Sequence, residues 1–465
     1  MLCIVLALTV ARPQVTPGPI MRDFESYYAA GRAWTAHDNP YSTELWRHER
    51  TIPGVRGDRW EALPFLGFPA FLPLWALLAA APFNVAAVLW GIVMIVLLLF
   101  AVWVMLEQVH GRDVGSFLSV AAMCIAFAPL TSALALGQAA LPAWSLIVIA
   151  TALFVSAPGV AGIATFFAAL QPNLAIALLS QIRYRNVLFA IAITMFALIA
   201  LALILVGFHG FASYLGELFA HGAAERHALI QFTPSAIGYG LGLPIVIANG
   251  LGVTTGIAAA IIWIAIMLNR RLTRWWRLAI TCALLPFAAP FFHEHDFVID
   301  LAPMLMCLCI APRRIWPIAA AATVLVAVDW LGLAQRPNAI LQSALLVLAL
   351  LCAIFALSDQ PLRLHRFALL AALLFIPAAL LAHRFPAPIW PDALPAHVTW
   401  IRATLPDAWH AQLQAAHELS PQPLWAALRL LTLFGSGLLA WCSIATARGA
   451  PSTLRLAQGT LTDSG

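Results

Sequence analysis

Two polar segments that lie far apart in this 465-residue chain carry the side chains best suited to chemistry. The first contains Asp23, immediately before a predicted helix, and the second is the run His293–Asp296, which reads His-Glu-His-Asp. A carboxylate before a helix often caps its first turn, and it can also accept a proton in an acid–base reaction. Imidazole and carboxylate groups are metal ligands, although residues two apart share a side only in extended chain. The residue types alone leave these alternatives open.

The element that must position Asp23 is an amphipathic helix predicted over residues 24–36, which Asn39-Pro40 ends. Tyrosines of such a helix usually anchor it at a membrane–water interface. Five of its residues lie near one side: Phe24, Tyr27, Tyr28, Gly31 and Trp34.

The composition excludes a soluble globular protein, because 62% of the residues are hydrophobic and 10% are charged, against about 45–50% and about 25% in soluble domains. A membrane-crossing helix needs about 20 mostly apolar residues, so we predict an all-α, polytopic bundle of about 12–13 spans over residues 1–465. We find no internal repeat and no soluble domain. Two of the apolar runs, 64–81 and 160–180, contain prolines, so a re-entrant segment is an alternative to a crossing there. The runs lie at 64–81, 84–106, 114–131, 140–156, 160–180, 186–207, 250–268, 278–292, 296–311, 315–333, 339–357, 367–383 and 424–446.

The positive charge fixes the predicted orientation. All 25 basic residues are arginine and the net charge is +5, which in a membrane protein indicates cytoplasmic loops rather than a nucleic-acid partner. Arginine clusters at 183–185, 270–277, 313–314 and 363–366 fall on one side when the helices between them are counted. One crossing from 270–277 brings His293 to the outer side of a plasma membrane. Further clusters follow at 448–455.

Two long loops are predicted on the outer side. The loop at 12–62 emerges there, with short interfacial helices, provided that the run at 1–11 crosses; that run is only about half the length needed. In the loop at 385–422, Pro406 starts a short helix that can lie in the membrane interface. A third outward segment, at 221–235, carries Glu225, Arg226 and His227. One face of the Pro406 helix holds Trp409, Leu413 and Ala416.

All seven cysteines lie inside apolar runs, where a thiol behaves as a small hydrophobic group. The sequence therefore predicts no disulfide framework and no zinc site.

Several short motifs resemble, in the same order, those of glycosyltransferase family 87, integral membrane transferases of the GT-C superfamily that use polyprenyl-phosphate-linked sugars. The resemblance covers roughly residues 20–310. Two positions depart from the family pattern: Ala70 replaces a second proline, and Gln171 replaces a lysine, which puts a phosphate role at that point in doubt. The matching motifs are Asp23-Phe24 with Tyr27-Tyr28 and Asn39-Pro40-Tyr41, then Phe68-Pro69 with Phe71 and Pro73, Gly137-Gln138, Pro172 with Leu174 and Leu178, and residues 289–295.

The resemblance implies a hexosyltransferase that moves a mannose-like sugar from a polyprenyl-phosphate donor to a hydroxyl of a glycan or glycolipid on the outer face. Asp23 would act as general base in a direct, inverting displacement. The lipid-linked sugar is a substrate, and neither a cofactor nor a metal ion is expected. Residues implied in binding the donor phosphate or sugar are Arg22, His293, His295, Gln138, Tyr27 and Tyr28.

Alternatives remain for several of these residues. His293 and His295 are also consistent with solvated interface residues or with metal ligands lacking an evident fourth partner, and Gln138 with a helix-end hydrogen bond. Two other classes of protein fit the composition: a transporter, in which intramembrane acids such as Asp300 and Asp329 bind or relay ions, and a non-catalytic membrane component of an envelope polysaccharide system.

Overall fold

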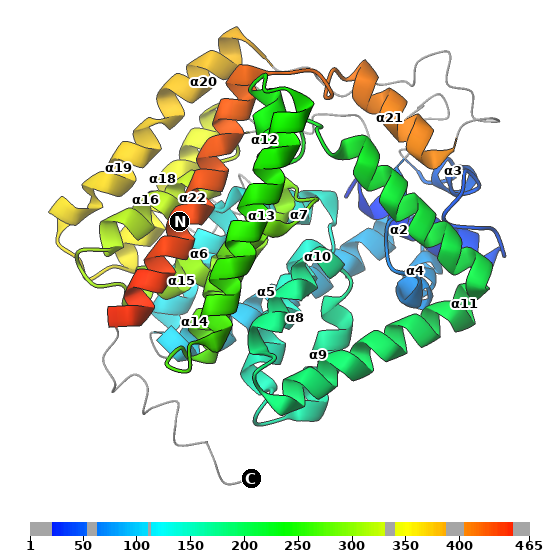
Figure 1. Ribbon diagram of the computed structural model, residues 1–465, viewed down its shortest axis with the longest axis horizontal. Coiled ribbons are helices and arrows are strands. Elements are labelled where there is room, and N and C mark those ends of the chain that lie inside the picture. The colour runs from blue at the N-terminus through cyan, green and yellow to red at the C-terminus, as the bar shows by residue number, and fades with distance from the viewer. Residues whose placement is uncertain (1–20, 54–62, 110–112, 331–339, 387–403, 450–465) are drawn as a thin grey trace.

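The computed structural model describes residues 21–53, 63–109, 113–330, 340–386 and 404–449. Within these ranges 78% of the chain is helical and no strand occurs. The run at 1–11 and parts of both long loops lie outside the described residues. Figure 1 shows the helices in two groups: α2, α3, α4, α21 and part of α11 on one side, and α16, α18, α19, α20 and α22 on the other.

Among the described residues, five segments are long and apolar enough to cross a membrane, or six if the bent pair α6–α7 counts as one span. They are α5 (Phe83–Val109), α11 (Arg185–Glu225), α13 (Ile245–Leu268), the combined segment Leu362–Arg384, and Pro423–Arg448 within α22 (Pro423–Gly449). The bent pair is α6 (Val114–Ala126) and α7 (Ala128–Leu136), which meet at 69°.

Most other apolar runs form helices of 10–17 residues. A helix of 14 residues rises only about 21 Å, less than the roughly 30 Å hydrocarbon layer. The all-helical architecture is confirmed, with five or six candidate spans among the described residues, while the count of 12–13 crossings stays a prediction. These shorter helices are α8 (Ala140–Leu153), α9 (Pro158–Ala168), α14 (Arg274–Ala288), α15 (Leu301–Ile310), α16 (Trp316–Ala327) and α18 (Ile340–Ala356).

The remaining elements are short. They are α2 (Phe24–Thr35), α3 (Leu45–Glu49), η1 (Pro69–Phe71), α4 (Leu72–Ala79), α10 (Pro172–Ala175), η2 (Ile176–Gln181), α12 (Pro234–Gly240), η3 (Glu294–Asp300), η5 (Leu362–His365), α19 (Arg366–Leu373), α20 (Phe375–Arg384) and α21 (Leu405–Ala415).

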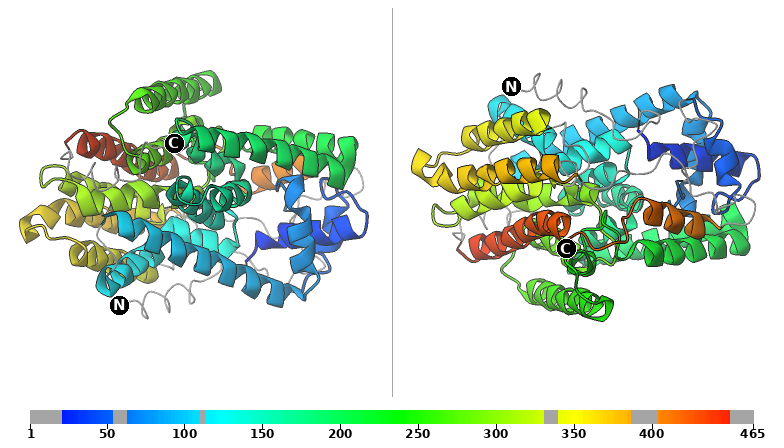
Figure 2. Two further views of the ribbon diagram at one scale, coloured as in Figure 1. Left: turned by 90° about the horizontal axis from the view of Figure 1, so that it is seen from below. Right: turned by 90° about the horizontal axis from the view of Figure 1, so that it is seen from above.

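The outward-facing side chains fit a lipid environment. In the most apolar window of α13 only 11% of residues are buried, and Figure 2 shows this helix standing out from the rest of the bundle. Val246 is 82% exposed and Leu268 is 75% exposed. A continuous apolar surface of this kind is unusual on a soluble monomer and marks a contact with membrane or partner.

The helix α11 bends at Gly207, where the predicted apolar run also ends. Gly207 has φ +67° and ψ 178°, which are not helical values. Such a conformation is accessible to glycine because it has no Cβ. The bend turns residues 208–225 into a separate amphipathic segment, visible in Figure 1, that ends at Glu225.

The predicted Pro406 helix is confirmed as α21, with Pro406 in its first turn. Its apolar face packs on protein, however, because Trp409 and Leu413 are buried in a cluster with Leu63 and Ala228. This helix therefore closes over the segment that follows α11.

Candidate functional site

Four segments that are distant in the sequence bring their polar side chains to one place. They are the start of α2 at 22–27, the Gly137-Gln138 step after α7, the stretch 171–173 at the start of α10, and residues 293–296 before α15. Asp23, Tyr27, Gln138, Gln171, Asn173 and His293 are half-buried. The group is therefore buried enough to hold its geometry and accessible enough to meet a ligand.

Asp23 occupies the N-cap position of α2, yet its side chain makes no capping hydrogen bond. Instead, its Oδ2 accepts a hydrogen bond of 2.6 Å from Nε2 of Gln138. The hydroxyl of Tyr27 donates to Oε1 of the same amide at 3.2 Å. Asp23 therefore has the position of a helix cap, but its carboxylate does not cap α2. Gln138, in the step between α7 and α8, holds the carboxylate in place.

Gly137 lets the start of α2 approach the end of α7 closely. It adopts φ +74°, and a Cβ at this position would lie 2.8 Å from Cβ of Phe24. The N–H of Asp23 donates to the carbonyl of Leu136 at 3.0 Å, and Nε1 of Trp90 donates to the carbonyl of Gly137 at 2.9 Å. These bonds fix the backbone that carries Gln138. Its side-chain amide is therefore held in position to donate to the carboxylate of Asp23.

The second half of the site is built around Asp296. His293 is extended, with φ −99° and ψ 173°, and its N–H donates to Oδ2 of Asp296 at 3.0 Å. The same carboxylate accepts hydrogen bonds from Nε2 of Gln171 at 3.1 Å and from Nδ2 of Asn173 at 3.2 Å. The extended residue places the rings of His293 and His295 with centroids 5.2 Å apart.

Because Gln138 and Gln171 both reach this group, the helices between them, α8 and α9, leave the site and return to it as a hairpin. The segment 171–181 then runs to the arginine-rich end of α14, where Nε2 of Gln181 donates to the carbonyl of Arg274 at 3.0 Å. The helix α14 leads from Arg274 back toward His293. The polar group and this arginine cluster thus lie at opposite ends of α14.

Glu225 also belongs to this site, although no role was predicted for it from the sequence. It is 1% exposed, and its Oε2 lies 3.1 Å from Nε2 of His293 and accepts from Nε2 of Gln231 at 2.6 Å. Its Oε1 accepts from Nε1 of Trp409 at 2.6 Å and lies 3.2 Å from Nε2 of His221. The acid–histidine spacing at 221–227 was visible in the sequence, but its pairing with residue 293 depends on the fold.

Asp23 acts electrostatically on both histidines. Burial lowers the pKa of His295 to about 3, and the charge of His293 acts in the same direction, while Asp23 opposes both. For His293, burial favours the neutral ring, but Glu225, Asp296 and Asp23 together raise its pKa. Burial raises the pKa of Tyr27, and Asp23 and Asp296 add to that effect. The carboxylates of Asp23, Asp296 and Glu225 therefore all act on His293.

Other predicted site residues lie differently. Tyr28 is 5% exposed, its hydroxyl donates to the carbonyl of Ala81 at 2.9 Å, and its ring packs on Phe83 with centroids 5.2 Å apart. It points into the α2–α5 packing, so the structure does not bring it to the site. Arg22 is half-buried immediately before Asp23. Asp300 is fully buried near Cys282 and Ser436.

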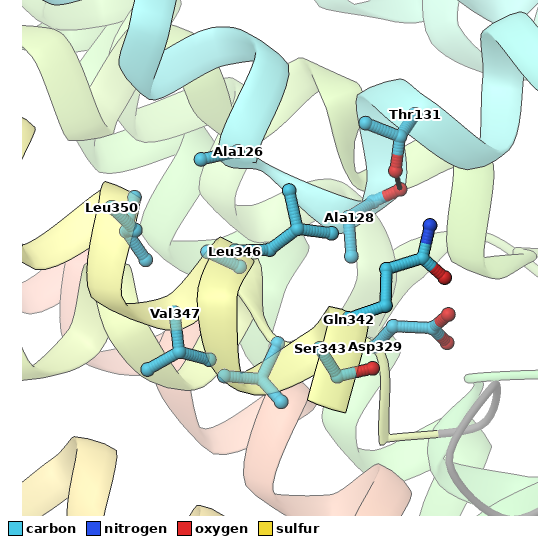
Figure 3. A pocket seen from close by; sticks show the side chains of 11 residues that line it. Ala126, Ala128, Thr131, Asp329, Gln342, Ser343, Leu346, Val347 and Leu350 are labelled. Atoms are coloured by element: carbon cyan, nitrogen blue, oxygen red, sulfur yellow. Dashed lines mark hydrogen bonds between the residues drawn. The ribbon is translucent and has the colours of Figure 1, made fainter. Parts of the chain in front are cut away.

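A small hollow lies elsewhere along α7, where Thr131 faces Asp329 and the start of α18 (Figure 3). Gln342 and Ser343 complete its polar lining, and the rest is apolar. Asp329, which the sequence analysis singled out, belongs to this hollow rather than to the Asp23 group.

Comparison of the chain with family models, curated proteins and solved structures gives no match.

Proposed function

We propose that this chain is a membrane glycosyltransferase that moves a hexose from a polyprenyl-phosphate donor to an acceptor hydroxyl, with Asp23 as general base. The observation that carries the proposal is the placement of the Asp23 carboxylate, which makes no capping hydrogen bond, is held by Gln138 and acts electrostatically on His293 and His295. A carboxylate that only stabilised α2 would bond the first turn of that helix.

The proposed chemistry needs a proton acceptor at the attacking hydroxyl. Oδ2 of Asp23 is occupied by Gln138 at 2.6 Å, which leaves Oδ1 as the oxygen to take the proton. A base positioned within about 3 Å of the hydroxyl contributes typically about 10²–10⁴-fold to the rate. Attack on the anomeric carbon with departure of the lipid phosphate inverts that centre.

The leaving phosphate is proposed to lie against His293 and His295, with Arg22 as a cation at the start of α2. In this arrangement Asp23 faces the acceptor hydroxyl, and His293 and His295 face the phosphate of the donor. Tyr27, stacked on Trp75 at 4.6 Å between ring centroids, offers a fixed aromatic surface next to Gln138.

The outer face of the membrane is the proposed compartment, because one predicted crossing, at 278–292, separates the polar group from the arginine cluster at 270–277. Short arginine-rich loops resist translocation and stay in the cytoplasm. The acceptor is accordingly a glycan or glycolipid of the cell envelope, and the donor reaches the site from the lipid.

Transfer by the purified full-length protein tests the function directly. With a radiolabelled polyprenyl-phosphate mannose and a mixture of membrane glycolipids as acceptors, we expect labelled product to form without ATP or sugar nucleotide. Proteoliposomes that accumulate a solute along an ion gradient, and release no polyprenyl phosphate from any hexose donor, would instead identify a transporter.

A further inference from the structure

We infer that His293, His295 and Asp296 bind a divalent transition-metal ion, of the kind that Zn²⁺ represents, with an open coordination position on the side of Asp23. Each of the three residues offers one ligand atom, and these atoms all lie within 4.8 Å of one another. Two ligands at about 2.0–2.1 Å from Zn²⁺ are at most about 4.2 Å apart. Small side-chain rotations therefore complete the set.

The donor types fit such an ion. Two imidazoles and one carboxylate, with a further position left for water or substrate, form a recurrent set for catalytic zinc and for related divalent metals. His295 is buried, and its Nε2 lies 3.9 Å from Oδ1 of Asp296, a separation too long for a hydrogen bond and suited to an ion between the two atoms.

The surroundings orient the proposed ligands. Metal-bound histidines usually donate their second N–H to a carboxylate. Nε2 of His293 lies 3.1 Å from Oε2 of Glu225, which leaves Nδ1 for the metal. Asp296 is likewise held by Gln171 and Asn173. Both ligands thus have the supporting contacts typical of a metal site.

The local charge also favours a cation. Asp23, Asp296 and Glu225 all act electrostatically on His293, and the last two acids are buried. A phosphate approaching three carboxylates would be repelled, and a divalent ion between them would offset that repulsion. This second role, in which the open position takes a phosphate oxygen of the donor, rests on the proposed function; the metal site itself does not.

Metal binding can be measured apart from turnover. Tag-free full-length protein in detergent, stripped with EDTA and passed through a desalting column, would be titrated with Co²⁺ while the visible absorption is recorded. We expect one equivalent of Co²⁺ to bind with a d–d spectrum, and one equivalent of Zn²⁺ to displace it. No uptake, or uptake without a saturating spectrum, would overturn the site.

Variants locate the ion. His295→Asn should weaken Co²⁺ binding by at least tenfold, and Glu225→Gln, which changes a partner of His293 but none of the three proposed ligands, by about 10–100-fold. His227→Asn is the matched control, because its ring bonds Asn249 at 2.9 Å outside the proposed ligand set, and it should bind like the wild type. Equal binding by wild type and His295→Asn would contradict the assignment even if transfer activity is present.

The two proposals fail separately. A protein that binds one Co²⁺ at these residues and yet transfers no hexose keeps the metal site and loses the transferase function. A protein that transfers hexose at an unchanged rate in excess EDTA and takes up no Co²⁺ keeps the function and loses the metal site.

Discussion

The side-chain amide of Gln138 donates a 2.6 Å hydrogen bond to the carboxylate of Asp23, across 115 residues of sequence. The bond ties the end of α7 to the start of α2 and fixes the orientation of the carboxylate. The hydroxyl of Tyr27 holds the other atom of the same amide. Gln138 is thus a positioning residue, acting through Asp23.

Replacing Gln138 should misplace the base without removing it. For Gln138→Ala we expect kcat to fall on the order of 10- to 100-fold with KM for the lipid donor nearly unchanged. Gln138→Glu should also move the low-pH limb of the rate profile to higher pH, because a second carboxylate disfavours ionisation of the first. Gln414→Ala, on the exposed face of α21, should show none of these effects. If the pH–rate profile of Gln138→Glu matches that of the wild type, Gln138 has only a structural role.

The close approach at Gly137 makes a stability prediction. Gly137→Ala introduces a Cβ at φ +74°, only 2.8 Å from Phe24, so the thermal midpoint in detergent should drop. The left-handed backbone alone costs about 1–2 kcal/mol. Gly216→Ala is the control, since that helical position has no atom within 4 Å of the added Cβ, and it should match or exceed the wild type. Equal midpoints for both variants would contradict the packing at the α2–α7 junction.

The buried His295 makes a prediction about pH in EDTA-treated protein. Its pKa is lowered to about 3, whereas an unfolded histidine titrates near about 6.5. Between these values the unfolded chain binds more protons, so this contribution to stability is present above about pH 6.5 and is lost as the pH falls. The thermal midpoint should therefore drop more between about pH 7 and about pH 5 in the wild type than in His295→Asn.

The pKa of His293 is raised, so its contribution to stability changes with pH in the opposite direction. Because His293 is present in both the wild type and His295→Asn, the test is the difference between their thermal midpoints. If both proteins lose the same number of degrees, His295 is not a buried neutral ring.

Orientation in the membrane can be tested by labelling single cysteines in whole cells. Arg314→Cys and Arg363→Cys, both exposed, should react only after the membrane is opened, because the arginine clusters are predicted inside. Gln414→Cys on α21 should react from outside, since α21 covers the Glu225 side of the site. The background carries Cys352→Ser, because Cys352 is exposed. External labelling at position 314 would reverse the topology.

The sequence predicted the helical membrane architecture well because composition and apolar runs determine it directly. It also indicated Pro406 as a helix start, since proline fits the first turn. It did not predict that α8 and α9, in the runs 140–156 and 160–180, pair as a hairpin that returns to the site, because run length alone does not fix which helices pair. The burial of the α21 face against Ala228 was likewise invisible.

For the site, local sequence indicated Asp23, His293 and His295. The partner of His293, Glu225, depended on the tertiary fold. The role of Glu225 required the bend at Gly207 and the docking of Trp409, neither of which leaves a local signal. Tyr28 was grouped with Tyr27 by adjacency; neighbouring helical residues point about 100° apart, and its hydroxyl bonds Ala81 instead.

The most direct test of the central claim is the turnover of Asp23→Asn with a polyprenyl-phosphate sugar. Asparagine keeps the size of the side chain and can accept from Gln138 through its oxygen, but it cannot take the proton of the acceptor. We predict wild-type thermal stability and donor binding with turnover reduced by about 10²-fold or more, while Asp38→Asn, in the same loop beside His48, stays active. A stable Asp23→Asn protein with near-normal turnover would contradict the assignment of Asp23 as the base.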